Sequence, residues 1–118
     1  MTPETWMEEF PAAITICDPQ GVIVGMNAKA CESFASDGGA ALIGTNLLAC
    51  HPEPARTKVA ELLRTQARNV YTIEKAGVKK LIYQSPWFVE GRFAGLVELS
   101  LPIPDVMPHF IRETPPAR

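Results

Sequence analysis

The residue types best suited to chemistry in this sequence stand side by side at positions 50 and 51, a cysteine and a histidine. A thiolate and an imidazole can each ligate haem iron or another metal, and the positive end of a helix favours a thiolate. Adjacent side chains diverge, so at most one of Cys50 and His51 would reach a given metal. Three interpretations stay open: haem binding, redox sensing, and a structural pair in which Cys50 fills the core and His51 forms a hydrogen bond in a loop.

Two further cysteines, Cys17 and Cys31, bring the total to three. An odd number of cysteines at wide spacing fits neither a disulfide framework nor a zinc site, so no metal ligand set is predicted. A free cysteine behaves as a small hydrophobic residue, and we expect reduced thiols of which at least two are buried. If the protein senses oxidation, Cys31 is the better candidate.

Three amphipathic aromatic residues, Tyr71, Tyr83 and Trp87, are suited to line a cavity, because each has an apolar body and a polar tip. Plain core or sheet-surface positions are the alternative. Catalytic signatures are missing: the sequence has two histidines, no nucleophile elbow, no phosphate-binding glycine loop and no zinc-protease motif. We therefore do not expect an enzyme.

The composition is that of one soluble globular domain: 118 residues, 47% hydrophobic and 20% charged. A net charge of −2 gives no electrostatic basis for binding nucleic acid or an anionic membrane, and Lys79 and Lys80 are expected on the solvated surface. The N-terminus lacks the pattern of a secretory signal, and no apolar run approaches the ~20 residues of a membrane span. We expect a cytoplasmic protein.

These residues must be positioned by local elements, and the clearest of them is a β-hairpin. Residues 14–17 and 22–26 are rich in β-branched side chains, and residues 18–21 (DPQG) between them form a turn sequence. Asn27 follows the second strand at once, and its side chain can cap a helix at 28–34.

Short helices are predicted before and after this hairpin. Residues 2–10 predict an amphipathic helix with Thr2 as the N-cap and Pro3 in the first turn, and its apolar pair Trp6 and Phe10 must pack on its own sheet or on a second copy. Residues 36–39 predict a flexible loop, followed by single turns at 40–43 and 47–50. Residues 54–67 predict the longest helix, with Val59, Leu62 and Leu63 on its apolar stripe.

The last third of the domain predicts an antiparallel meander of strands at 69–75, 78–89 and 92–101. In the final strand the odd-numbered positions from Phe93 to Leu101 are expected to face the core. Pro86 predicts a bulge or an outward-turned N–H, and the prolines after residue 101 should end the last strand. The tail, 105–118, should pack loosely on the domain or on a partner through Met107, His109, Phe110 or Ile111.

The spacing of five residues in the hairpin and first helix resembles the opening of a PAS domain, a small sensory module of signalling proteins: Asp18, Gly21, Ile23, Asn27 and Ala30. The later order of elements is similar to the same family. The resemblance implies an α+β fold with a five-stranded antiparallel sheet and short helices on one face. It divides the chain into an N-terminal helix (1–11), a sensor domain (12–104) and a tail (105–118). No coiled-coil linker or effector follows, which suggests a small stand-alone PAS protein.

The resemblance also implies a pocket for a small ligand between the sheet and the helices, with output through protein contacts. Its expected partners are a second copy, bound through Trp6 and Phe10, or a separate signalling protein. The alternatives are a haem or thiol redox sensor at Cys50 and His51, and a docking module that binds no ligand. The residues expected to contact the ligand are Cys31, Asn46, Cys50, His51, Tyr71 and Tyr83.

Overall fold

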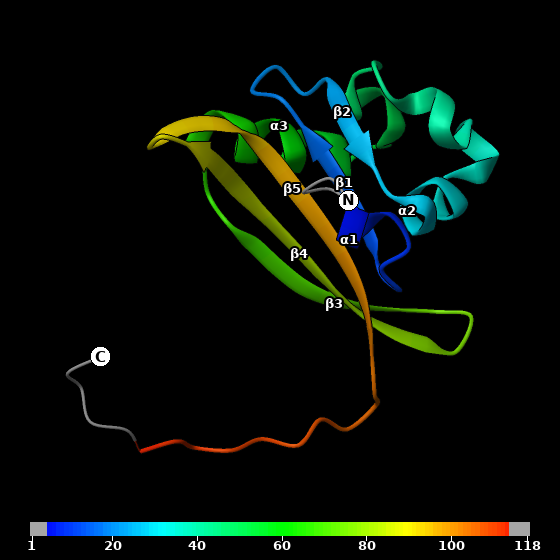
Figure 1. Ribbon diagram of the computed structural model, residues 1–118, viewed down its shortest axis with the longest axis vertical. Helices are drawn as coiled ribbons and strands as arrows, with labels where there is room; N and C mark the ends of the chain where they lie inside the picture. Colours follow the sequence, from blue (N-terminus) through cyan, green and yellow to red (C-terminus); the bar gives the residue numbers. More distant parts are fainter. Residues whose placement is uncertain (1–4, 114–118) are drawn as a thin grey trace.

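Figure 1 shows the computed structural model, which describes residues 5–113, as a five-stranded sheet crossed by short helices. The sheet order is β2-β1-β5-β4-β3, and every neighbouring pair is antiparallel. The predicted α+β class and five-stranded sheet are confirmed. The strands are β1 (Ala13–Cys17), β2 (Ile23–Met26), β3 (Asn69–Lys75), β4 (Val78–Val89) and β5 (Arg92–Ile103).

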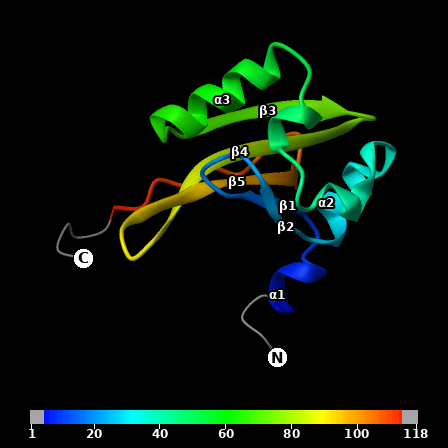
Figure 2. The same ribbon diagram turned by 90° about the horizontal axis from the view of Figure 1, so that it is seen from above.

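The helices lie on both sides of this sheet. Figure 2 shows α3 on one side and α1 on the other. The N-terminal helix ends at Glu8, two residues before the predicted end, and the predicted start at Thr2 and Pro3 lies outside the described residues. The helical elements are α1 (Thr5–Glu8), α2 (Ala28–Ser33), α3 (Ala55–Thr65) and the 3-10 turns η1 (Ala35–Asp37), η2 (Gly39–Leu42) and η3 (Leu47–Cys50).

The hairpin between β1 and β2 closes through the side chain of Asp18. Its Oδ1 accepts hydrogen bonds from the backbone N–H groups of Gln20 and Val22, both at 2.9 Å. Gly21 has φ +89°, a value that favours glycine over residues with a Cβ. The hairpin predicted from the turn sequence at residues 18–21 is therefore present in the structure.

Asn27 joins three elements at the end of this hairpin. Its Oδ1 accepts from the backbone N–H of Ala30 at 3.0 Å, which caps α2, and from that of Ile14 at 2.9 Å. Its Nδ2 donates to the carbonyls of Met7 at 2.9 Å and Ala12 at 2.8 Å. Asn27 is fully buried, so these bonds replace all of its water contacts. One side chain thus holds α1, β1 and α2 together.

The helix α3 follows a short proline-containing segment, residues 51–54, that carries one acidic residue, Glu53. The carboxylate of Glu53 accepts from the backbone N–H of Thr57 at 2.9 Å and from its hydroxyl at 2.8 Å. These hydrogen bonds lower the pKa of Glu53. The helix ends at Gln66, whose backbone is left-handed with φ 56°. Two residues on its apolar stripe, Val59 and Leu62, are buried against the sheet, as the sequence predicts.

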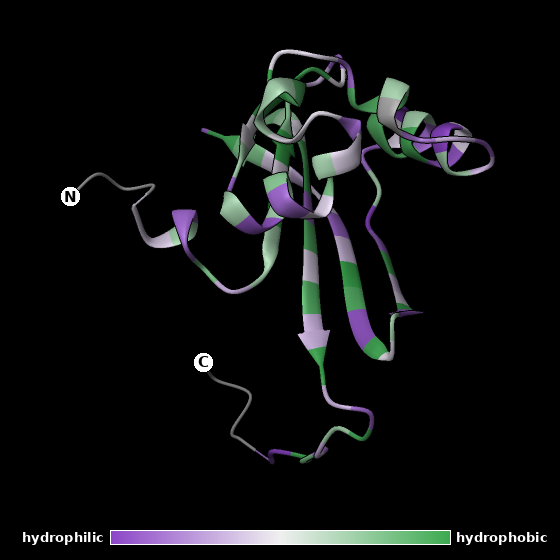
Figure 3. Ribbon diagram, turned by 90° about the vertical axis from the view of Figure 1, so that its right-hand side faces the viewer, coloured by the Kyte–Doolittle hydropathy of each residue, from purple (hydrophilic) through white to green (hydrophobic). Residues whose placement is uncertain are grey.

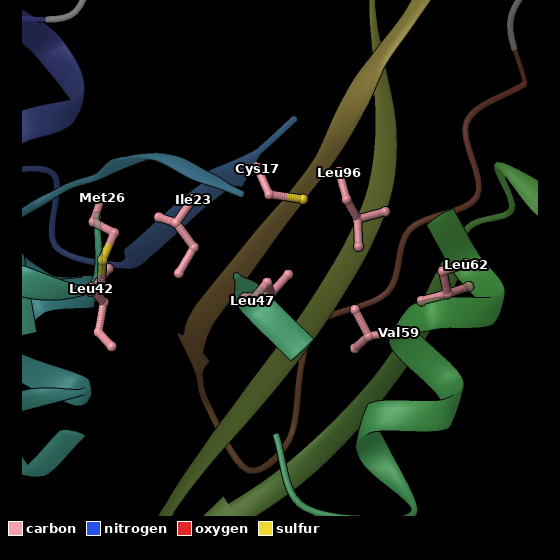
Figure 4. Close-up of a cluster of buried hydrophobic side chains, with 9 residues drawn as sticks. Cys17, Ile23, Met26, Leu42, Leu47, Val59, Leu62 and Leu96 are labelled. Carbon is pink, nitrogen blue, oxygen red and sulfur yellow. The ribbon is translucent and has the colours of Figure 1, made fainter. Parts of the chain in front are cut away.

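The hydrophobic core fills the space between one end of the sheet and the helices (Figure 4). Cys17 in β1 and Leu96 in β5 are paired in the sheet, and both point into this cluster. The backbones of β1 and β5 lie so close together there that a Cβ at Gly95 would collide with the Cys17 carbonyl oxygen. The same oxygen accepts the indole N–H of Trp87 at 3.1 Å. The other members of the core are Ile23, Met26, Ala30, Leu42, Leu47, Val59 and Leu62.

The prediction for the facing of β5 is wrong. Leu96, at an even-numbered position, is 2% exposed in the core, and the side chains of Val97 and Leu99 point to the opposite face of the sheet. The polar residues Glu98 and Ser100 share the face of Leu96, so the alternation of this strand favours the wrong face. Figure 3 shows hydrophobic and hydrophilic bands alternating along the long strands. We call the face that carries Leu96 the inner face.

Two further segments differ from prediction. The predicted flexible loop at 36–39 falls in the two 3-10 turns η1 and η2 and in Gly38 between them, and the Phe34 carbonyl accepts backbone bonds from Asp37 and Gly39, both at 2.9 Å. The strand β5 continues to Ile103, with Pro102 paired to Lys80. The pairing of β5 with β1 ends at Ser100, so the missing N–H of Pro102 leaves no neighbour in β1 unsatisfied. The irregularity in the pairing of β4 with β5 lies between Trp87 and Phe88, where β5 contributes the extra residue Ala94, so it does not coincide with Pro86.

The chain leaves the sheet after β5 and runs away from the domain in Figure 1. Residues 104–113 contain no helix or strand. Four apolar side chains there are largely exposed, which contradicts packing of this segment on its own domain; packing on a partner remains a prediction. Among residues 5–113 there is no helix long and apolar enough to cross a membrane. The exposed side chains are Val106, Met107, Phe110 and Ile111.

Candidate functional site

A cavity of about 420 Å³ lies on the inner face, next to the packed core. Its floor is formed by strands β1, β3, β4 and β5, and its walls include the end of α2 with Glu32, Ser33 and Phe34. His51, just after η3, closes another part of the wall. The size suits a small organic molecule. The floor residues are Ala13, Thr15, Tyr71, Ile73, Lys75, Lys80, Ile82, Glu98 and Ser100.

A hydrogen-bonded row of three polar side chains crosses three strands beside this cavity. Asn69 in β3 donates through Nδ2 to Gln84 Oε1 at 2.8 Å, and Gln84 in β4 donates through Nε2 to Glu98 Oε2 at 2.7 Å. The three residues are direct partners in the register of the sheet. Gln84 is 3% exposed, so its amide has little access to water. The row orients the Glu98 carboxylate at the cavity floor.

Tyr71 lies next to this row, since its sheet partner Ile82 is two residues from Gln84. Burial raises the pKa of the Tyr71 hydroxyl, and the negative charge of Glu98 raises it further. The two groups are therefore close enough to interact electrostatically. The hydroxyls of Thr15 and Ser100 belong to the same floor, where Thr15 pairs with Glu98 in the sheet. This part of the cavity offers hydrogen-bond acceptors, donors and an aromatic ring.

His51 links the cavity wall to the turn before it. Its Nδ1 lies 2.9 Å from the carbonyl oxygen of Leu47, which fixes Nδ1 as the protonated nitrogen and leaves Nε2 as an acceptor. Leu47 is buried in the hydrophobic core. A molecule that moves His51 therefore also acts on a turn anchored in the core.

Of the six residues predicted to contact a ligand, His51 and Tyr71 line this cavity. Cys31 is half-buried in α2 and packs against the core cluster. Asn46 is exposed beside the β1–β2 hairpin, where it caps η3 through Leu48 N at 2.9 Å. Tyr83 points to the opposite face of the sheet, and its hydroxyl accepts from Arg68 at 3.2 Å. The side chain of Cys50 lies outside the described part of the structure.

Glu98, Thr15 and Ser100 line the cavity although the sequence did not point to them, and Lys80, expected on the solvated surface, lines it as well. Glu98 and Ser100 follow Leu96 at alternate positions of β5, so they share its face. Their polarity favours the opposite interpretation, that this side of the strand faces water. Leu96 could have indicated the role of Glu98 and Ser100, because it lies on their face of β5 and pairs with the buried Cys17. Of the two cysteines whose side chains are described, only Cys17 is buried.

The residues around the cavity indicate how well it suits a haem or a metal ion. Within residues 5–113, no three residues among His, Cys, Asp and Glu are grouped to hold a metal ion. His51 is the residue that could ligate a haem iron, through Nε2, because Nδ1 donates to the Leu47 carbonyl. A porphyrin in this cavity would cover the Glu98 carboxylate with an apolar surface, which is costly for a charged group. The cavity fits a polar organic molecule better than a haem.

A five-stranded antiparallel sheet with a small, partly polar cavity under short helices defines an α+β module whose cavity has the size of a small organic molecule. A family model described as the PAS fold matches residues 7–103. The chain belongs to the PAS family, as the spacing in its hairpin and first helix suggested. No curated protein matches the sequence.

Solved structures share this fold. A sensory box sensor histidine kinase from Vibrio cholerae matches with a TM-score of 0.60 and 20% identity, over 86% of this chain and 88% of that one. The Aer2 receptor from Vibrio cholerae, titled a dual PAS-heme oxygen sensor, has a TM-score of 0.55 and 18% identity, over 79% and 95%. The sensor region of a sensor histidine kinase has a TM-score of 0.57 and 20% identity over 76% of this chain, which spans 38% of that chain. At such identities these matches concern the fold.

Proposed function

We propose that this protein is a sensory PAS module that binds a small ligand in the cavity on the inner face and signals through protein contacts. The observation that carries the proposal is the cavity itself: a partly polar floor on the sheet, with walls from α2, Phe34 and His51 outside the sheet. A docking module without a ligand would have no use for this space. The proposal contains no catalytic step.

Ligand binding would act on the segment between residues 36 and 54 and on the end of α2. Phe34 lines the cavity and also packs against the core cluster, and His51 is hydrogen-bonded to Leu47 in the core. A ligand that favours one arrangement of these walls shifts the population toward it by its difference in affinity for the two arrangements. The change at the cavity thus reaches the packed part of the domain.

Asn27 provides a route from the cavity wall to the opposite side of the sheet. It caps α2, which lines the cavity, and it donates to Met7 in α1 at 2.9 Å. Trp6 in α1 is 64% exposed, and its ring meets that of Phe10 at 5.9 Å between centroids. An exposed aromatic pair suits a protein interface. We therefore assign output to a homodimer, or to a separate signalling protein, that contacts Trp6 and Phe10.

Native mass spectrometry with an absorption spectrum on freshly purified protein tests this function. We expect a dimer with a small molecule retained, and loss of the dimer in a Trp6→Ala/Phe10→Ala variant. Phe88→Ala is the matched control, because Phe88 is also an exposed aromatic residue in an edge-to-face ring pair, with Phe93, but belongs to β4 rather than to α1. A Soret band lost on His51→Ala would instead establish the haem alternative. A protein that binds no compound in a metabolite library would leave only the docking alternative.

A further inference from the structure

On the basis of the proposed function, we propose that the ligand is a small zwitterion with an amine at one end and an acid at the other. The amine binds Glu98 and the acid binds the lysines at the far end of the floor, Lys75 and Lys80. The spacer between them is apolar. The arrangement of charges along the inner face carries this assignment.

The amine end follows from the surroundings of Glu98. Gln84 donates to Oε2 of Glu98 at 2.7 Å, and Asn69 holds Gln84 in this orientation, so the row presents an acceptor and no donor to the cavity. Within residues 5–113 the one ion pair is Lys29 with Glu32, at 3.7 Å on the surface of α2. Glu98 is half-buried and has no cationic partner in this part of the chain. A protonated amine supplies the missing charge and a hydrogen-bond donor.

The neighbours of Glu98 also suit an ammonium group. The Tyr71 ring lies within the electric field of Glu98, which raises the pKa of its hydroxyl. An aromatic face beside a carboxylate attracts a cation by its quadrupole. Thr15, which pairs with Glu98 in the sheet, and Ser100, two residues along the strand, add hydroxyl oxygens that can accept from the remaining N–H groups.

The acid end follows from the register of the sheet. Lys80 pairs with Pro102, four residues along β5 from Glu98, which places the two backbone positions about 13 Å apart. Lysine is long and flexible, so the two charges can approach to about 6–10 Å across the cavity. Lys75 is paired with Val78 still further along the same face. Ile82 and Ile73 occupy the floor between the charged ends and suit an apolar spacer.

The remaining charged or titratable groups on the cavity do not change this assignment. Glu32 is paired with Lys29 on the surface. His51 presents Nε2 on the wall as an acceptor, because its Nδ1 donates to the Leu47 carbonyl. The chain therefore offers one unpaired carboxylate at one end and two lysines at the other, which together favour a dipolar ligand over a simple cation or anion.

Thermal shift and native mass spectrometry on the full chain test this with a defined probe series. The probes are β-alanine, aminocaproate, hexylamine and hexanoate, which vary the spacer and remove each charge in turn. We expect aminocaproate to bind most tightly, hexylamine and hexanoate about 10- to 100-fold more weakly, and β-alanine weakly because its charges are too close to span the floor.

Variants identify the contacts. Glu98→Gln keeps an acceptor for Gln84 but removes the charge, and should weaken aminocaproate about 10- to 100-fold, whereas Glu61→Gln on the exposed face of α3 should not. Lys80→Gln should weaken aminocaproate and spare hexylamine. Lys79→Gln is the matched control, because Lys79 points to the other face and donates to the Asp105 carbonyl at 3.4 Å.

The two possible failures differ. Tight binding of neutral or purely anionic compounds, unchanged by Glu98→Gln, would overturn the zwitterion assignment and leave the sensory function standing. Absence of binding by every probe and by every metabolite screened would overturn both. Binding of aminocaproate that Glu98→Gln does not weaken would also overturn the assignment of its amine to Glu98.

Discussion

The two ends of the inner face differ although they belong to the same strands. At one end, which we call the packed end, Cys17 and Leu96 are buried beneath Val59 and Leu62 of α3. At the other, the open end, the floor carries Glu98, Ser100, Tyr71 and Lys80 around a cavity of about 420 Å³. In β5 the change from apolar to polar takes place between Leu96 and Glu98, two residues apart.

This difference suggests that the packed end of the sheet provides stability and that the open end is available for binding. The packed end buries large apolar side chains, which is the main source of folding free energy. The open end holds an unpaired carboxylate and partly buried polar groups, which stabilise the fold little. A domain of this size has few apolar residues to spare, so concentrating them at one end leaves the other free to recognise a ligand. Mutations at the two ends should therefore have opposite consequences.

Leu96→Ala should cause the largest loss of stability, because Leu96 is 2% exposed at the centre of the packed end. The free energy of unfolding should fall by about 2–5 kcal/mol, from lost apolar burial and the cavity that remains. Urea unfolding followed by circular dichroism measures the change. Ser100→Ala, on the same face of the same strand at the open end, is the matched control and should change stability by less than about 0.5 kcal/mol. Equal losses for the two variants would contradict the division of the sheet.

Asn27→Asp tests the link between the packed end and α1. Aspartate keeps the acceptor for Ala30 and Ile14 but places an oxygen against the carbonyls of Met7 and Ala12. We expect a loss of about 1–3 kcal/mol, measured in the same unfolding assay.

The control for this variant is Asn46→Asp. Asn46 also caps a turn, at Leu48 N, and also donates to a carbonyl, that of Gln20 at 3.1 Å, but it is exposed. Water can replace its lost bond, so its loss of stability should be much smaller. A variant at Asn27 as mild as the one at Asn46 would mean that α1 is not held through the Asn27 amide.

The packed end could be predicted from the sequence to a large extent. The turn at 18–21, the cap at Asn27 and the buried stripe of α3 each follow from local rules, and the structure contains all three. Their spacing also identified the family. Local physics suffices where a residue's role depends on its immediate neighbours in the chain.

The open end could not be predicted in the same way. Its floor combines residues from four strands, and the role of Glu98 depends on Gln84 and Asn69 in the neighbouring strands. Polar residues at alternate positions of a strand indicate a solvent-facing side, and here they face a cavity instead. The prediction that odd positions of β5 face the core is wrong for this reason. A binding site breaks the pattern on which the prediction of facing depends.

The reactivity of the Cys17 and Cys31 thiols tests the burial of the packed end with the least disturbance of the fold. In a Cys50→Ser variant only these two thiols remain. Cys17 is buried at the packed end, whereas Cys31 on α2 is half-exposed and packs against the same core cluster without being one of its buried members. Iodoacetamide followed by mass spectrometry should show Cys31 alkylated at least about tenfold faster. Equal rates would mean that the interior of the packed end opens to solvent as readily as the surface of α2.

The burial of Cys17 also predicts how the unfolding free energy changes with pH. Burial raises the pKa of Cys17 above its ordinary value of 9.0, and Asp18 and Glu98 add to the rise against a hydrogen bond from the Leu96 backbone. The native state thus holds this proton more tightly than the unfolded chain does. The stability that the neutral thiol contributes is complete below pH 9.0 and is lost as the pH rises through the raised native pKa. The unfolding free energy of the parent should therefore fall relative to a Cys17→Ala variant above pH 9.0, and a constant difference would show that Cys17 meets water in the native state.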